Sequence, residues 1–146
     1  MIPLFDDRGN LPPGIHEADW DELEATFGGS ARRARLLSGL REALLALRSA
    51  GCRTAYIDGS FATAKEEPGD FDGCWDTEGV VGSLLDPVLL DFAHPRKAQK
   101  EKFGGELFLA QAVADPRSGA QFLDFFQRDR DGNPKGIVKI DLEGLA

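Results

Sequence analysis

The clearest hydrophobic pattern in the chain lies between residues 31 and 50. Leucines recur there at three- and four-residue intervals and form one apolar stripe: Leu36, Leu37, Leu40, Leu44 and Leu47. This is the period of an α-helix that buries one face. Ser30 can cap its first turn, and Gly51 can end it. We therefore predict a long helix, and we expect its arginines to lie on the solvated face: Arg32, Arg33, Arg35, Arg41 and Arg48.

Shorter patterns predict the other elements. Alternating or β-favouring runs indicate strands at residues 53–58, 70–75, 106–113 and 137–142. Helical spacing indicates short helices at residues 18–26 and 96–103, and weaker helical character at 79–92, where Asp86-Pro87 resembles a helix start. The run at 121–127 fits a helix or a strand, and turns are expected at 7–10 and 131–134. The mixture predicts an α+β fold, with a small mixed β-sheet packed against helices, in one domain over residues 1–146.

Composition and charge narrow the class of protein. Hydrophobic residues make up 42% and charged residues 29% of the 146 positions, as in ordinary globular proteins. We expect a cytoplasmic protein with no membrane partner, because neither a membrane-spanning run nor a signal sequence is found. The net charge of −8 disfavours general nucleic-acid binding, which relies on Lys and Arg at phosphates. Cys52 and Cys74 match no zinc or redox spacing, so we expect two buried, reduced thiols.

Candidate chemistry gathers between residues 56 and 72. Asp70 and Asp72 are two positions apart in a predicted strand, so both carboxylates project from the same face. Like charges held so close repel unless a cation lies between them, and oxygen-only ligands favour Mg²⁺ or Mn²⁺. Gly59-Ser60 follows the preceding strand, where backbone N–H groups and a hydroxyl suit phosphate oxygens. Lys65 in the same loop can add a positive charge.

These residues resemble a known family. Gly59-Ser60, a short loop and then Asp70-Phe71-Asp72 are similar to the core of the polymerase-beta-like nucleotidyltransferases. Three further stretches, at residues 9–16, 58–61 and 125–130, resemble a small uncharacterised bacterial family of nucleotidyltransferase-like proteins. The resemblance implies a minimal nucleotidyltransferase-like fold and Mg²⁺-dependent transfer of a nucleotidyl group from a nucleoside triphosphate to a hydroxyl acceptor. Gly69 and Gly73 depart from it, because the family has apolar residues at both flanks of Asp-x-Asp.

The resemblance also implies a third carboxylate on a later strand, which completes the metal site and takes the proton from the attacking hydroxyl. Glu106 ranks first, and Asp124 and Asp141 remain alternatives. We expect Asp58 to be a solvated charge near a strand end and Lys135 to be an ordinary surface lysine, with a phosphate-binding role as the alternative for Lys135. Without a third carboxylate, the alternative is a catalytically reduced binding module that acts with a protein partner, as in some toxin–antitoxin pairs. A solvated acidic turn at residues 66–70 is the purely structural alternative.

Overall fold

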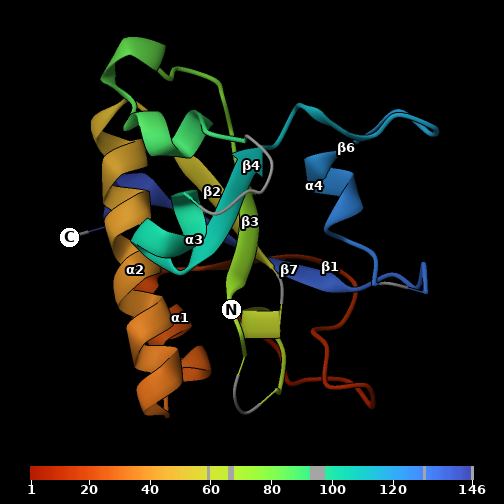
Figure 1. Cartoon of the computed structure of the whole chain (residues 1–146). Helices are drawn as coiled ribbons and strands as arrows, with labels where there is room; N and C mark the ends of the chain where they lie inside the picture. The colour runs from red at the N-terminus through yellow and green to blue at the C-terminus, as the bar shows by residue number, and fades with distance from the viewer. Residues whose placement is uncertain (59, 66–67, 93–97, 130, 146) are drawn as a thin grey trace.

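The computed structural model describes residues 1–58, 60–65, 68–92, 98–129 and 131–145, and of Ser60 only the backbone. Over these residues the chain forms a five-stranded sheet and a separate two-stranded one (Figure 1). The larger sheet has the order β1 (Gly14–Ala18), β7 (Gly136–Asp141), β2 (Thr54–Asp58), β3 (Phe71–Trp75) and β4 (Gly105–Leu109). β2 is antiparallel to both neighbours, whereas β1–β7 and β3–β4 are parallel pairs. The predicted α+β class with a mixed sheet is therefore confirmed.

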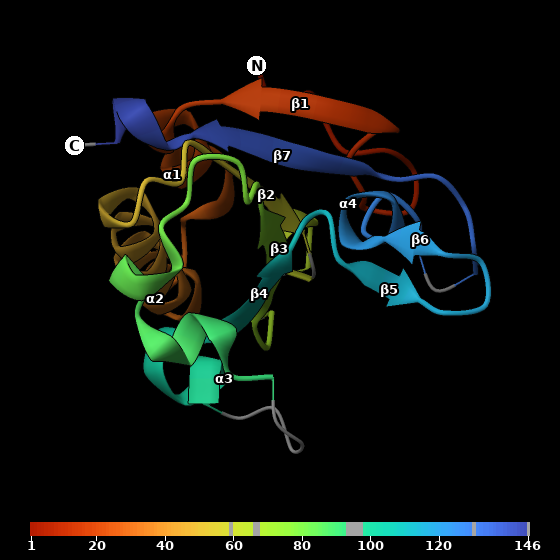
Figure 2. The same ribbon diagram turned by 90° about the horizontal axis from the view of Figure 1, so that it is seen from above.

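The helices α1 (Trp20–Phe27), α2 (Ala31–Ser49) and α3 (Ala98–Phe103) lie over one face of this sheet (Figure 2). The Ser30 side chain caps α2 by accepting a hydrogen bond from the backbone N–H of Arg33, as predicted. The leucine stripe of α2 packs against sheet residues whose side chains alternate toward it: Ala55, Ile57, Phe71, Trp75, Val138 and Ile140. All of these side chains are buried, so this layer contains most of the apolar core.

The opposite face of the sheet is only partly covered. A hairpin of β5 (Val113–Asp115) and β6 (Ala120–Gln121), followed by α4 (Phe122–Phe125), lies on that side (Figure 2). Its contact with the sheet is aromatic: the Phe108 ring of β4 stacks on Phe122 with 4.4 Å between ring centroids and also contacts Phe126. The polar part of the same face carries the candidate site.

Several elements differ from the sequence-based expectation. β1 was not predicted, and the predicted strand at 106–113 is divided between β4 and β5 by a turn. The region at 79–92 forms 3₁₀ turns at Gly82–Leu84 and Pro87–Leu90, the second capped by the Asp86 side chain as expected.

Both cysteines are free and buried, in agreement with the prediction. Among the helices in the described part of the chain, none is both long and apolar enough to cross a membrane.

Candidate functional site

Three carboxylates stand side by side on the adjacent strands β2, β3 and β4, near one end of each strand. Asp58 of β2 is in register with Asp72 of β3, and Asp72 is in register with Glu106 of β4. Register neighbours project from the same face, with Cβ atoms about 5 Å apart. Phe71 is fully buried in the core under the helices, so Asp70 and Asp72 on either side of it point to the opposite face, as their spacing predicts. We call Asp58, Asp70, Asp72 and Glu106 the carboxylate cluster.

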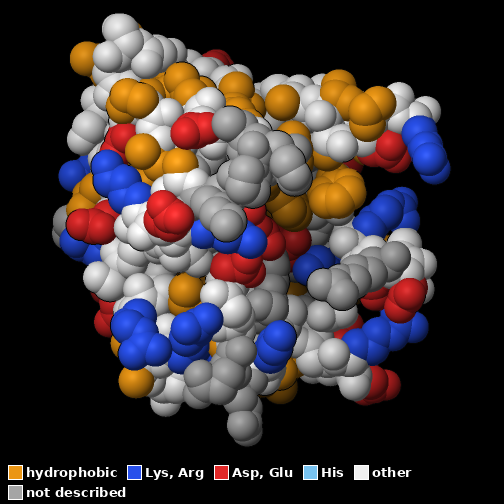
Figure 3. Space-filling view, viewed as in Figure 1, with side chains coloured by type: hydrophobic (Ala, Val, Ile, Leu, Met, Phe, Trp, Pro, Cys, Tyr) orange, Lys and Arg blue, Asp and Glu red, His pale blue; other side chains and the backbone are white. Residues whose placement is uncertain are grey.

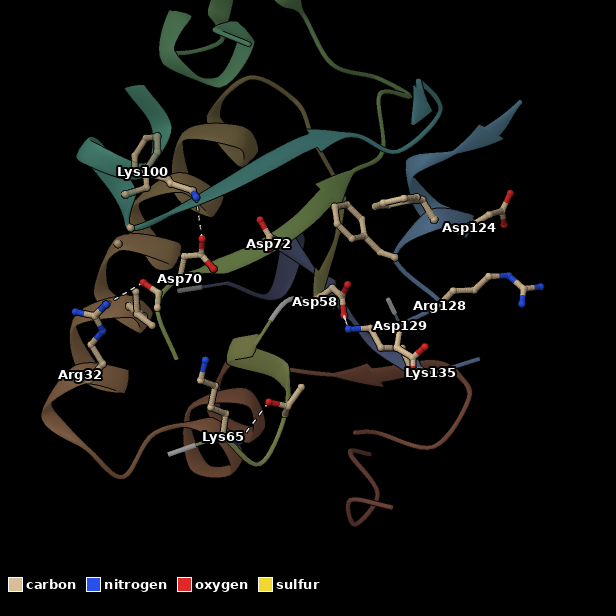
Figure 4. Close-up of a pocket in the computed structure, with 18 of the residues that line it drawn as sticks. Arg32, Asp58, Lys65, Asp70, Asp72, Lys100, Asp124, Arg128, Asp129 and Lys135 are labelled. Atoms are coloured by element: carbon tan, nitrogen blue, oxygen red, sulfur yellow. Dashed lines mark hydrogen bonds and ion pairs between the residues drawn. The ribbon is translucent and has the colours of Figure 1, made fainter. Parts of the chain in front are cut away.

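Two lysines neutralise part of this charge. The Lys100 ammonium, from α3, lies 3.1 Å from Oδ2 of Asp70 and 3.5 Å from Oε1 of Glu106. The Lys135 ammonium lies 2.7 Å from Oδ1 of Asp58, and both of these side chains are largely buried. Figure 4 shows the lysines approaching from different sides, with Asp72 between the two ion pairs. The carboxylate cluster therefore contacts two ammonium groups but contains four carboxylates.

The prediction that Asp58 and Lys135 are ordinary exposed charges is wrong. Asp58 is only 4% exposed, because on the partly covered face of the sheet its side chain lies beside Asp72 and against the Lys135 side chain. Lys135 directly precedes β7, the strand that pairs with the other edge of β2, and this brings its ammonium to the Asp58 carboxylate. The sequence alone does not show this pairing, so it could not show the ion pair.

Burial and neighbouring charge both act on Asp72. The pKa of its carboxyl is raised to about 7, first by burial and then by the neighbouring Asp70, Asp58 and Glu106 carboxylates, while Lys100 opposes the shift. The Lys100 pKa is raised in turn, chiefly by its hydrogen bond to Asp70. A carboxyl that resists ionisation beside other carboxylates marks a place where an additional cation would be favourable.

The donor set fits a hard divalent cation, because carboxylate oxygens are the ligands that Mg²⁺ and Mn²⁺ prefer. The arrangement of the side chains fits less closely. Within the described ranges, no group of three or more His, Cys, Asp or Glu side chains is gathered tightly enough to hold a metal ion. Between Asp70 and Glu106 the structure has the Lys100 ammonium, which contacts both carboxylates. A metal ion at this position would have to displace that ammonium.

Three members of the carboxylate cluster, Asp58, Asp70 and Asp72, line a large pocket of about 1490 Å³. Figure 3 shows acidic side chains at the centre of this face, with Lys and Arg side chains around them. Basic side chains line the pocket from several elements: Arg32 and Arg35 from α2, Lys65 from the loop after β2, Lys100 and Lys102 from α3, Arg128 after α4, and Lys135 before β7. Ligand pockets are typically about 300–1,000 Å³, so there is room for a nucleotide and part of an acceptor.

The predicted phosphate-binding residues are placed in part. Lys65 is exposed on the pocket wall, and its side chain points up toward the carboxylate cluster in Figure 4. A 3₁₀ turn over Ser60–Ala62 directly follows β2, which is the position expected of a phosphate-binding loop. Gly59 and the side chain of Ser60 lie outside the described residues.

Arg33 holds this loop from behind. Its guanidinium donates hydrogen bonds to the carbonyl oxygens of Phe27 (3.1 Å), Phe61 (2.8 Å) and Thr63 (2.9 Å), and it also contacts the carbonyl of Lys65. The residue is 7% exposed, so the expectation of a solvated arginine is wrong here. A signal was present in the sequence, because position 33 falls on the same helical stripe as Leu36, Leu37 and Leu40.

Of the candidates for the third carboxylate, Glu106 lies beside Asp72. Asp124 is an exposed residue of α4, and in Figure 4 its side chain points away from Asp72. Asp141 is exposed at the end of β7, where its side chain caps the final turn by accepting from the backbone N–H of Glu143. Neither alternative reaches the register row that contains Asp72.

The glycine after Asp72 has a structural reason. A Cβ atom at Gly73 would lie 2.1 Å from the carbonyl oxygen of Tyr56 in β2 and 3.2 Å from the Leu107 side chain in β4. A contact that short is impossible without moving β2. Glycine at this position therefore keeps the strands that carry Asp58 and Asp72 close together.

Comparison with known proteins gives one match. The model of a family of unknown function, DUF6932, matches residues 3–141, which include every element of the larger sheet and the whole carboxylate cluster. No curated protein and no solved structure matches the chain. Since the family model covers nearly the whole sequence, the chain belongs to the DUF6932 family.

Proposed function

We propose that this protein is a nucleotidyltransferase that moves a nucleotidyl group from a nucleoside triphosphate to a hydroxyl group and releases pyrophosphate, with Mg²⁺ or Mn²⁺ as the required ion. The observation that carries the proposal is the register between Asp72 and Glu106 in adjacent parallel strands. It supplies a third carboxylate beside the Asp70–Asp72 pair, which is the feature whose absence would favour a non-catalytic module. The resemblance of the loop from Gly59 to Asp72 to nucleotidyltransferases gives independent support.

Each carboxylate has a distinct task in this proposal. Asp70 and Asp72 would hold the divalent ion, which supplies charge stabilisation at the phosphate oxygens. Glu106 would accept the proton of the attacking hydroxyl, because it lies next to Asp72 and its side chain is largely sheltered from water. Asp58 is held by Lys135 and would act as a fixed negative charge behind the site.

The walls of the pocket suit the rest of a nucleotide. Lys65 and Arg35 place positive charge where the triphosphate would lie, and backbone N–H groups at the start of the Ser60–Ala62 turn would add donors. On the opposite wall, Phe125 is 50% exposed and offers an apolar ring surface to a base or to the acceptor. The pocket therefore combines a charged part and an aromatic part.

The test has a binding arm and a turnover arm. We expect ATP or GTP with Mg²⁺ to raise the melting temperature of the wild type but not that of Asp70→Ala/Asp72→Ala. Asp141→Asn is the matched control, because it removes an exposed aspartate far from the carboxylate cluster. Label transfer from an α-labelled nucleoside triphosphate to cellular small molecules, proteins or RNA should be lost in Glu106→Gln, while nucleotide binding survives.

Equal melting shifts in the wild type and the double alanine variant would overturn the metal assignment. Mg²⁺-dependent nucleotide binding without label transfer to any acceptor would instead favour the alternative, a catalytically reduced module that acts with a protein partner.

A further inference from the structure

The position of Lys100 bears on how the carboxylate cluster would take up a metal ion. Its ammonium contacts Asp70 and Glu106 at once, at 3.1 and 3.5 Å, on the two sides of Asp72. These residues come from three places in the chain: the loop before β3, the helix α3 and the strand β4. A single positive charge therefore contacts both Asp70, one of the two carboxylates that the proposed function assigns to a divalent ion, and Glu106, the proposed base.

The ion pairs of Lys100 are partly exposed and can exchange. The Lys100 side chain is 47% exposed, and a lysine carries its charge on a flexible four-carbon stem. Partly exposed ion pairs are each worth about 1 kcal/mol or less, so the two contacts of Lys100 cost little to break. By contrast, Lys135 is 12% exposed against Asp58 and has little freedom to leave. Of these two lysines, Lys100 is the one that can exchange its partner.

We propose that Lys100 exchanges the carboxylates of Asp70 and Glu106 for the triphosphate when a metal–nucleotide complex enters, so that the site selects this complex over the bare ion. This inference rests on the proposed function. A bare divalent ion must displace the ammonium into water with no new partner for it. A metal–triphosphate complex brings excess negative charge, so the released ammonium gains phosphate oxygens next to the site it left. Lys100 therefore weakens the binding of the bare ion and strengthens the binding of the metal–triphosphate complex.

The proposal is testable, because removing the Lys100 charge should change the two affinities in opposite directions. Lys100→Met keeps most of the side-chain length and removes the charge. We expect it to bind Mn²⁺ alone about three- to tenfold more tightly than the wild type, the range expected for losing two partly exposed ion pairs. We expect its affinity for the Mn²⁺ complex of a non-hydrolysable nucleoside triphosphate to fall by a similar factor. Free Mn²⁺ is followed by electron paramagnetic resonance, and nucleotide binding by titration calorimetry.

Lys102→Met is the matched control. It removes the same charge from the same short helix and from the lining of the same pocket, but Lys102 pairs with Asp86 instead of the carboxylate cluster. We expect it to change the two affinities by less than twofold. Lys100→Arg keeps the charge and should retain the wild-type preference for the metal–nucleotide complex. Circular dichroism checks that each variant is folded.

The outcomes separate the two proposals. If Lys100→Met binds both ligands more weakly, binds both more tightly, or matches Lys102→Met, the exchange is refuted while the metal site stands. If neither the wild type nor Lys100→Met binds Mn²⁺ any better than Asp70→Ala/Asp72→Ala does, the proposed metal site itself fails, and the exchange fails with it.

Discussion

The buried ion pair between Lys135 and Asp58 gives the sharpest prediction for stability. We expect Lys135→Met to destabilise the fold far more than the same change at Lys139, four residues along the same segment. The Lys135 side chain is 12% exposed and lies 2.7 Å from Asp58, whereas Lys139 is 36% exposed and lies 3.5 Å from Glu17, itself 78% exposed. The two lysines differ mainly in the burial of their partners.

The magnitude follows from the charge left behind. Without Lys135, the Asp58 carboxylate would stay buried beside Asp72, its register neighbour. Removing one member of a buried pair typically costs about 3–5 kcal/mol. A surface pair such as Lys139–Glu17 contributes about 1 kcal/mol or less. In the double variant Asp58→Asn/Lys135→Met the buried charge is gone, so we expect at least half of the lost stability to return.

Urea unfolding followed by circular dichroism measures these differences. With a urea dependence of about 2 kcal/mol per molar, a loss of about 3 kcal/mol lowers the unfolding midpoint by about 1.5 M. The reasoning is refuted if Lys135→Met and Lys139→Met unfold at the same urea concentration. It is also refuted if the double variant is no more stable than Lys135→Met alone.

Three further predictions concern other buried groups. The Asp72 pKa of about 7 lies above the value near 3.8 in the unfolded chain, so its stabilising contribution is full below about pH 4 and is lost as pH rises through 7. Asp72→Asn should therefore become more stable relative to the wild type in urea unfolding at pH 8 than at pH 5; the same difference at both pH values would contradict the shift. Burial raises the pKa of Cys52 to about 11 and of Cys74 to about 12, so neither native thiol should react with Ellman's reagent at pH 8, and both should react in urea. Arg33→Met should cost about 3 kcal/mol in urea unfolding, because buried carbonyl groups lose a charged donor, whereas the exposed Arg48→Met should cost less than about 0.5 kcal/mol. A small effect at Arg33 would show that these hydrogen bonds contribute little.

Local patterns were enough to predict the elements on which the site is built. The leucine stripe of α2, the short β2 and β3 strands and the final strand β7 follow from the spacing of apolar residues, and the structure confirms them. The shared face of Asp70 and Asp72 follows from the two-residue repeat of a strand. These features depend on residues that are close together in the chain, and the spacing of such residues is read directly from the sequence.

Features that depend on strand pairing could not be predicted from local sequence patterns. β1 forms only because β7 offers it an edge, and its exposed side chains give little alternation to detect. Glu106 was ranked first for its place in a predicted strand, but its position beside Asp72 needed the β3–β4 register. Burial of Asp58 likewise depends on partners from distant segments. Arg33 is different, because its position in the helical repeat, on the face of the leucine stripe, already indicates burial.

The place of β7 in the sheet bears on how the protein is made. β7 lies between β1 and β2, and both of these strands leave the ribosome well before it does. Until residues 136–141 are synthesised, β1 has no partner in the larger sheet and one edge of β2 stays open. Unpaired strand edges invite association with other chains, and contacts between distant segments slow folding. The growing chain therefore depends on β7 to join β1 to the rest of the sheet. We expect the nascent protein to be most vulnerable to aggregation just before β7 emerges.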